Sequence, residues 1–258
     1  MPLKKVLEDG RDLLSYCGVE RRYSMKVTRV LVVVASIFAL ASGAWGQSIS
    51  GKNPVIHGDK FAWPLAFQFF GSGPTVGVGN GPGLNTPTFT VSAYVRFNAL
   101  SHPPGSNGDR PAGDMSIVDK ISAAGVDNSD GWRLIKQDDG FFWFCLGGGP
   151  GTNGCMDDAA TTVISKTAPV IKVWYNVVGV LSESEIAIYV NGVKEASKPL
   201  PVFTDTHSAD MRIGSSAQGG GYAYFNGVID KVAFYGKVLS SKRINALCTA
   251  TNGGVPCH

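Results

Sequence analysis

A strict alternation of apolar and polar residues is the feature that most limits how this chain folds. In Phe89–Phe97 (FTVSAYVRF) every odd-numbered residue is apolar, and the residues between them include Tyr94 and Arg96. Ser184–Val190 alternates in the same way. Successive side chains of a β-strand point to opposite faces, so both segments are predicted to be antiparallel strands with one buried face.

Turn signals divide the rest of the chain into similar short segments. Asn191-Gly192 predicts a two-residue hairpin turn, because both of its central residues accept a positive φ. Glycine, at 33 of 258 residues, supplies many more turns. Further strands are predicted at Phe67–Phe70, Thr75–Val78, Ser116–Ile121, Trp132–Lys136, Phe141–Leu146, Thr162–Ser165, Trp174–Leu181, Asp210–Ile213 and Gly227–Tyr235.

This pattern predicts an all-β fold, a β-sandwich or jelly roll of two antiparallel sheets. Trp174–Leu181 is apolar on both faces, which is typical of a central strand. Ser240–Leu247 is predicted to be one short C-terminal helix of about two turns, with Ser240 as its N-cap.

Residues 1–46 have the composition of a leader. Lys26 and Arg29 precede the apolar run Val30–Leu40, and small residues follow it. This order is typical of a secretory signal peptide, and the apolar run is shorter than the ~20 residues of a membrane-spanning helix. We expect translation to start at Met25 and residues 47–258 to form a single domain. An uncleaved membrane anchor is the alternative.

The leader also accounts for the net charge of +3. It holds seven of the 23 basic and four of the 20 acidic residues, which leaves 16 of each in residues 47–258. A balanced domain of this kind does not carry the basic excess of a nucleic-acid-binding protein. The mature chain is therefore expected to bind no nucleic acid and to have no membrane span.

Four cysteines remain after the leader, namely Cys145, Cys155, Cys248 and Cys257. An even number in a secreted chain indicates two disulfides, for which three pairings exist. We favour the local pairs Cys145–Cys155 and Cys248–Cys257. A zinc site is the competing interpretation, but the chain has no C-x-x-C pair and its four histidines are scattered.

The second half of the chain resembles the LamG-like jelly rolls of the concanavalin A-like lectin/glucanase superfamily. The resemblance rests on a Trp-led strand and Asn-Gly hairpin in Val173–Val193, on Met211–Gly214 (MRIG), and on Tyr224–Ser240 (YFNGVIDKVAFYGKVLS). It covers roughly residues 65–247. The family resemblance implies two curved antiparallel sheets packed face to face and an extracellular binding module for glycans or proteins. Some members carry a calcium ion.

Two positions depart from the family pattern. Phe69-Phe70-Gly71 stands where Phe-Asp-Gly is common, so one carboxylate that could bind calcium is missing. Tyr94 stands where tryptophan is usual.

Asp230 is the acidic residue with the clearest predicted role. In a regular strand it shares a face with Val228, Val232 and Phe234, and a carboxylate on an apolar face needs a partner. The functional interpretation is a calcium ligand, assisted by backbone carbonyls. The alternative is a carboxylate bonded to backbone amides or paired with a nearby cation.

Aromatic side chains are the other candidates for ligand binding. We predict that Tyr222, Tyr224 and Trp143 contact a sugar. The two tyrosines follow the glycine-rich loop 218–221. The wider set that could form a stacking platform on the concave sheet also includes Tyr94, Phe142, Phe144 and Tyr189.

Catalysis is not expected. Glycoside hydrolysis needs two carboxyl groups about 5–9 Å apart. The only glutamates after the leader are Glu183, Glu185 and Glu195, around one hairpin. The sequence therefore predicts a secreted or extracytoplasmic (periplasmic or cell-surface), non-catalytic module that binds carbohydrate. The alternatives are an adhesion or structural protein that binds protein partners, and an unconventional glycan-cleaving enzyme.

Overall fold

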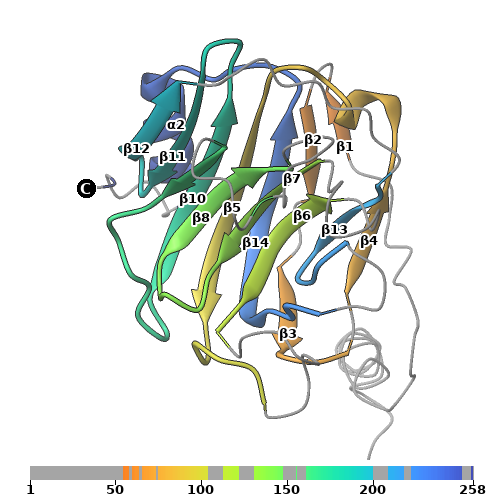
Figure 1. The fold of residues 1–258 in the computed structure, drawn as a ribbon, viewed down its shortest axis with the longest axis vertical. Coiled ribbons are helices and arrows are strands. Elements are labelled where there is room, and N and C mark those ends of the chain that lie inside the picture. The colour runs from red at the N-terminus through yellow and green to blue at the C-terminus, as the bar shows by residue number, and fades with distance from the viewer. Residues whose placement is uncertain are drawn as a thin grey trace, which may run out of the picture. The chain divides into compact units, whose positions relative to one another are not determined.

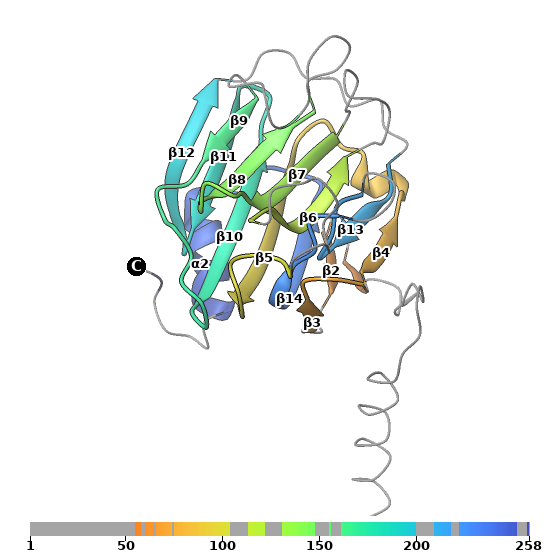
Figure 2. The ribbon, with the colours of Figure 1, turned by 60° about the horizontal axis from the view of Figure 1, so that its bottom comes forward.

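Two antiparallel sheets pack face to face in the computed structural model of this chain (Figures 1 and 2). The structure describes residues 55–57, 60–63, 66–73, 75–103, 113–121, 131–147, 155, 161–199, 209–217, 222–251 and 257. The sandwich confirms the predicted all-β fold class. The predicted leader, with Met25 and its cleavage site, lies outside the described residues.

Sheet A has eight strands in the spatial order β1-β2-β14-β5-β10-β11-β12, with β3 also paired to β14. The strands are β1 (Val55–His57), β2 (Lys60–Trp63), β3 (Phe67–Phe70), β5 (Phe89–Phe97), β10 (Trp174–Leu181), β11 (Glu185–Val190), β12 (Val193–Pro199) and β14 (Asn226–Tyr235). As predicted, β10 is a central strand, between β5 and β11, and seven of its eight residues are buried.

Sheet B has six strands in the order β4-β13-β6-β7-β8-β9. They are β4 (Val76–Gly79), β6 (Met115–Ile121), β7 (Gly131–Lys136), β8 (Phe142–Leu146), β9 (Thr162–Ile164) and β13 (Met211–Ile213). A 3₁₀ turn, η2 (Pro82–Leu84), precedes β5.

The core lies between the two sheets and is rich in aromatic rings. Phe89 of sheet A stands 5.1 Å from Trp132 of sheet B and 5.1 Å from Phe234, measured between ring centroids. All three rings are essentially inaccessible to solvent. Burying side chains of this size contributes roughly 1.5–3 kcal/mol each, and this apolar layer holds the sheets together.

One charged side chain also faces this interior. Lys120 is in register with Trp132 on the next strand and is fully buried. Its Nζ has no hydrogen-bond partner among the residues that the structure describes. Burial lowers the pKa of the Lys120 ammonium to about 8, against the opposing effect of Asp210.

The helix α2 (Ser241–Thr251) packs on the outer side of sheet A. Its Ile244 is buried in a second apolar cluster with Val178 and Tyr189 of the sheet. The backbone N–H of Arg243 donates to Ser240 Oγ at 3.3 Å, which confirms the predicted N-cap. The helix runs four residues beyond the predicted end. None of the helices that the structure describes is long and apolar enough to cross a membrane.

The hairpin between β11 and β12 has the predicted turn. Asn191 and Gly192 have φ values of 48° and 81°, and the Asn191 side chain accepts a 2.9 Å hydrogen bond from the Asn176 backbone. The sequence patterns did not predict β1 and β2, of three and four residues.

Candidate functional site

The outer face of sheet B carries a row of polar side chains across its strands. Asp119 of β6 is in register with Arg133 of β7, which is in register with Cys145 of β8. On the other side, Asp119 is in register with Arg212 of β13. The residues that alternate with this row, such as Trp132, are in the core, so the row faces away from it.

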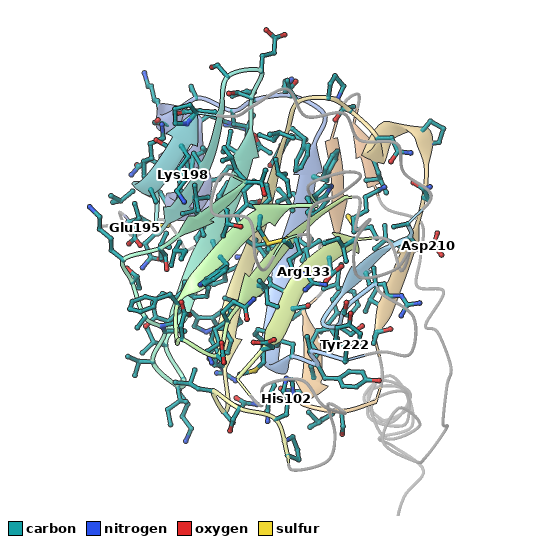
Figure 3. All side chains as sticks on the ribbon, viewed as in Figure 1. His102, Arg133, Glu195, Lys198, Asp210 and Tyr222 are labelled. Carbon is teal, nitrogen blue, oxygen red and sulfur yellow. A yellow bond between two sulfur atoms is a disulfide. The ribbon has the colours of Figure 1, made fainter. Side chains whose placement is uncertain are left out.

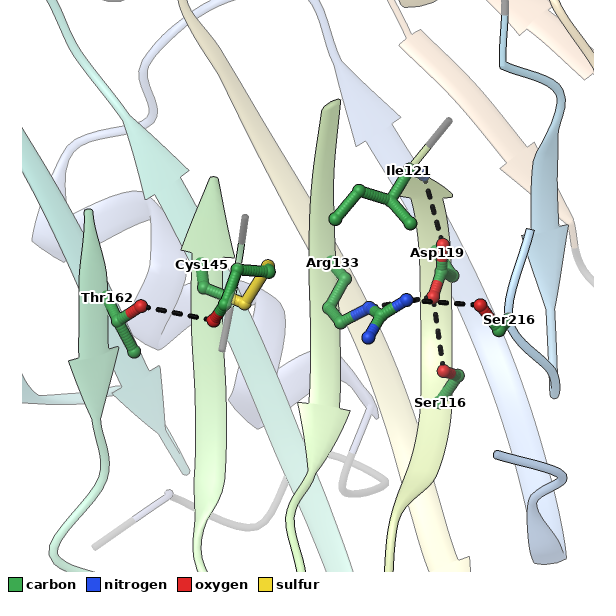
Figure 4. Close-up of a disulfide and its surroundings, with 8 residues drawn as sticks. Ser116, Asp119, Ile121, Arg133, Cys145, Thr162 and Ser216 are labelled. Atoms are coloured by element: carbon green, nitrogen blue, oxygen red, sulfur yellow. Dashed lines mark hydrogen bonds and ion pairs between the residues drawn. A yellow bond between two sulfur atoms is a disulfide. The ribbon is translucent and has the colours of Figure 1, made fainter. Parts of the chain in front are cut away.

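An ion pair forms the centre of this row (Figure 4). Arg133 Nε lies 2.9 Å from Asp119 Oδ2, and the two side chains are 3% and 0% exposed. Asp119 also accepts hydrogen bonds from Ser116 Oγ at 3.2 Å and from the backbone N–H of Ile121 at 3.0 Å. Arg133 Nη2 donates to Ser216 Oγ at 3.0 Å. A buried pair with these additional bonds fixes local geometry more than it adds stability.

This network anchors the segment that bears the two predicted tyrosines; Arg133 and Tyr222 are labelled in Figure 3. The Ser116 N–H donates to the Ala223 carbonyl at 2.8 Å, and the Ser216 N–H donates to the Tyr222 carbonyl at 2.8 Å. Ala223 is buried and has a φ of 53°. A left-handed alanine is strained and persists only where its surroundings hold it. Tyr222 and Tyr224, both half-buried, therefore flank a rigid point of the backbone.

Trp143 lies on the same outer face but not beside the tyrosines. Its indole Nε1 donates to Asp139 Oδ2 at 2.9 Å, and the ring is half-buried. In the row of β8, β7 and β6, the fully buried Ile135 and Ser116 stand between Trp143 and the backbone of Ala223. Three strand spacings correspond to about 14 Å. The structure thus brings Tyr222 and Tyr224 together and leaves Trp143 apart.

The wider stacking platform on one sheet was a wrong prediction. Phe142 and Phe144 belong to the interior core, because the alternation of β8 turns them inward. Tyr189 lies beneath α2, with its hydroxyl 3.1 Å from Ser241 Oγ. Tyr94 is on the outer face of the other sheet.

A regular strand would place Asp230 on the same face as Val232 and Phe234. In the structure Asp230 lies on the opposite face from these two residues. A β-bulge lies between Asp230 and Ala233, with Lys231 at a φ of 50°, so the faces exchange at this point. Asp230 is half-buried and accepts a 2.7 Å hydrogen bond from the Lys231 N–H.

The calcium hypothesis needs further oxygen ligands beside Asp230. Calcium takes six to eight oxygen ligands. Within the described residues no group of three or more His, Cys, Asp or Glu side chains could hold a metal ion. Calcium binding at Asp230 stays a prediction.

All four predicted cysteines are in disulfides, with the predicted local pairing. Cys145 joins Cys155 and Cys248 joins Cys257, at Cα–Cα distances of 5.1 and 5.9 Å. The first bridge lies on the outer face of sheet B, where both its cysteines pack with Ile121. These sulfurs are therefore not zinc ligands.

A second group of aromatic and charged side chains lies on the outer face of sheet A. Tyr94 of β5 stacks on Trp174 of β10 at a centroid distance of 4.6 Å and an interplanar angle of 8°. The Arg96 guanidinium carbon lies 5.3 Å from the Trp174 ring centre, and Lys231 Nζ lies 5.5 Å from that of Tyr94. Burial, and then the negative charge of Asp230, raise the pKa of the Tyr94 hydroxyl.

Sequence analysis assigned no role to Trp174, Arg96 or Lys231. The signal was partly present, because the alternation in Phe89–Phe97 already placed Tyr94 and Arg96 together on the polar face. The register that sets Trp174 opposite Arg96 could not be obtained from either strand alone.

Known structures share this fold. One is the CBM40 of the Ruminococcus gnavus IT-sialidase, solved with bound α2,3-sialyllactose (TM-score 0.51, 15% identity, covering 71% of this chain and 98% of that one). Another is domain 4 of AbnA, a GH43 extracellular arabinanase from Geobacillus stearothermophilus, solved with arabinotriose (TM-score 0.51, 17% identity, covering 79% and 86%). The Trypanosoma rangeli sialidase matches at a TM-score of 0.50 with 17% identity, over 73% of this chain but 28% of the enzyme.

No curated protein matches the sequence. A family match, in contrast, extends over residues 70–245, which is more than half of the chain, and it is described as the concanavalin A-like lectin/glucanases superfamily. The sandwich, its strand order and this match agree with one another. The chain belongs to the concanavalin A-like lectin/glucanase superfamily.

Proposed function

We propose that this protein is a secreted, non-catalytic carbohydrate-binding module whose ligand contacts Tyr222 and Tyr224. The observation that carries the proposal is the rigid anchoring of the segment between them. A buried ion pair, a strained Ala223 and two backbone hydrogen bonds hold two half-exposed tyrosines in fixed positions. Aromatic side chains fixed in advance bind at a low entropic cost.

The structural neighbours support a sugar ligand. The Ruminococcus gnavus module was solved with sialyllactose and the AbnA domain with arabinotriose, and each match spans most of the neighbour's chain. The sialidase match spans 28% of that enzyme, so its reaction is not carried over. Two disulfides favour an oxidising, extracytoplasmic location.

A glycan array with the full chain tests this proposal. The Tyr222→Ala/Tyr224→Ala double variant is expected to lose at least about tenfold in affinity for the glycans that the wild type binds, as for central aromatic contacts. Val193→Ala, an exposed change on β12, is the control that keeps binding unchanged. Unaltered thermal unfolding of the double variant would show that its fold is intact.

Three results would overturn the proposal. Unchanged glycan binding by the double variant would remove the tyrosines from the site. Release of reducing ends from a polysaccharide would show that the protein is catalytic. If the array stays silent while a purified extracellular protein binds, the protein-binding alternative replaces it.

A further inference from the structure

Arg212 brings a positive charge to the outer face of sheet B. It lies in β13 between Met211 and Ile213, which are both fully buried in the core. Since side chains alternate along a strand, Arg212 points away from the core, and it is half-buried. Its charge is therefore accessible to a ligand that binds on this face.

Ser216 connects Arg212 to the segment that bears the two tyrosines of the proposed site. Arg212 Nη1 donates to the Ser216 carbonyl at 3.4 Å, and the Ser216 N–H donates to the Tyr222 carbonyl at 2.8 Å. The Ser216 hydroxyl accepts the hydrogen bond from Arg133 that Figure 4 shows. A single residue thus separates the Arg212 guanidinium from the backbone of Tyr222, so an oligosaccharide on this face can contact both residues.

The carboxylate beside Arg212 is already neutralised. Asp119 of β6 is in register with Arg212, but it forms its ion pair with Arg133, at 2.9 Å. Two ion pairs are present among the residues that the structure describes, and Arg212 belongs to neither of them. Asp210, which is exposed and precedes β13, forms no ion pair in this part of the chain either. The row of two guanidiniums and one carboxylate therefore carries one excess positive charge.

The surroundings of Arg212 leave most of its guanidinium to a ligand. Its side chain makes one hydrogen bond to the described residues, and the 3.4 Å length is large beside the usual value of about 2.9 Å. A guanidinium carries several N–H donors, whose spacing matches two oxygens of an oxyanion. On the edge strand β4, the register partner of Arg212 is the exposed Gly77, which has no side chain to cover it. A glycine in a strand is typical of places where a ligand approaches closely.

We propose that the ligand of the tyrosine site is an acidic glycan, and that Arg212 binds its carboxylate or sulfate group. This inference rests on the carbohydrate-binding function proposed above and names the class of sugar. A sugar ring packs on Tyr222 or Tyr224, while the acidic group lies over Gly77 and accepts two parallel hydrogen bonds from Arg212. A neutral sugar would take water from the guanidinium without supplying a counter-charge.

A glycan array that holds charged glycans beside their neutral counterparts tests the sugar class with the full chain. One pair is oligogalacturonate and its methyl ester, and the other is 6-sulfated and unsulfated N-acetyllactosamine. We expect the glycans that bind to be charged, with affinities at least about tenfold above those of their neutral counterparts. Binding should weaken between about 50 and about 500 mM NaCl, because salt screens the charges. The pair that binds distinguishes a carboxylate from a sulfate.

Three variants test the role of Arg212. Arg212→Gln should weaken binding of the charged glycans by about tenfold and leave that of the neutral counterparts unchanged. Arg212→Lys should retain part of the affinity, because it keeps the charge but loses the paired donors. Arg243→Gln is the matched control, since it removes an exposed arginine on α2, on the outer side of the other sheet, and should leave binding unchanged. Equal thermal unfolding of all variants would show that the fold is intact.

The failure of this inference can be told from the failure of the proposed function. Equal binding of the neutral counterparts, lost in Tyr222→Ala/Tyr224→Ala, would overturn the acidic ligand and keep the carbohydrate-binding function. An array without any bound glycan would overturn both. An unchanged affinity of Arg212→Gln for the charged glycans would remove Arg212 from the site. An equal loss in Arg243→Gln would show an unspecific attraction between the glycan and the cations of the protein.

Discussion

The outer faces of the two sheets place charge and aromatic rings in opposite ways. On sheet B, Arg133 and Asp119 are almost wholly buried and bonded to each other and to serines. On sheet A, Arg96 lies over an indole that is half-exposed. The same residue type is therefore buried in an ion pair on one face and packed on an aromatic ring near the surface on the other. An arginine on a jelly-roll strand cannot be assigned a role before its burial and partners are known.

The largest expected effect comes from breaking the buried pair. Arg133→Leu leaves the Asp119 carboxylate buried without a counter-charge, which should lower the free energy of unfolding by about 3–5 kcal/mol. Urea unfolding followed by tryptophan fluorescence measures this. Arg96→Leu, on the other face, should cost less than about 1 kcal/mol.

A double variant sharpens the same comparison. Adding Asp119→Leu to Arg133→Leu should recover most of the lost stability, because the charge left behind has been removed. If Arg133→Leu and Arg96→Leu lowered the free energy of unfolding equally, the arginines of the two faces would contribute equally to stability.

An intermediate effect is expected at Lys120, which follows Asp119 on β6 but faces the interior. Its pKa of about 8 lies below the ordinary value of 10.5, so the folded protein binds fewer protons than the unfolded chain between these pH values. Stability should therefore rise as the pH increases from about 8 to about 10. Lys120→Met should remove this rise and stabilise the protein at pH 7 by about 1–3 kcal/mol. Melting temperatures of the wild type and Lys120→Met, measured across this pH range, test the prediction. An identical dependence of melting temperature on pH in both proteins would contradict it.

The smallest effect is expected from calcium at Asp230, which is in register with Tyr94. If Asp230 is a calcium ligand, millimolar calcium should raise the melting temperature of the wild type by a few degrees. Asp230→Asn should then show a smaller rise, while Asp139→Asn, in a turn of sheet B, should behave as the wild type does. No shift in the wild type, or an equal shift in Asp230→Asn, would remove the metal site.

The strands and the disulfides could be predicted because their signals are local. Alternation predicted the observed bounds of β5, a segment apolar on both faces predicted those of β10, and cysteines nine and ten residues apart had short loops to close. The candidate sites depend on relations that no local pattern contains. Trp174 and Tyr94 meet only through the register of two strands about eighty residues apart.

A single inserted residue determines the face of the sheet on which Asp230 lies. The bulge at Lys231 reverses which residues of β14 face the core, and the sequence around it shows no glycine or proline to mark it. Ala223 is similar, because its left-handed conformation is imposed by bonds to distant strands. Tertiary contacts, not local preference, set these two positions.

The last strand of sheet A determines how this protein can meet other chains. β12 ends the sheet, exposes Val193 and Lys194, and finishes at Pro199, which has no N–H to donate. A register shift in its pairing with β11 interrupts the regular ladder. Lysines, a proline and a bulge on an edge strand are the features that prevent another strand from adding to a sheet. The protein is thus protected at this edge against edge-to-edge aggregation.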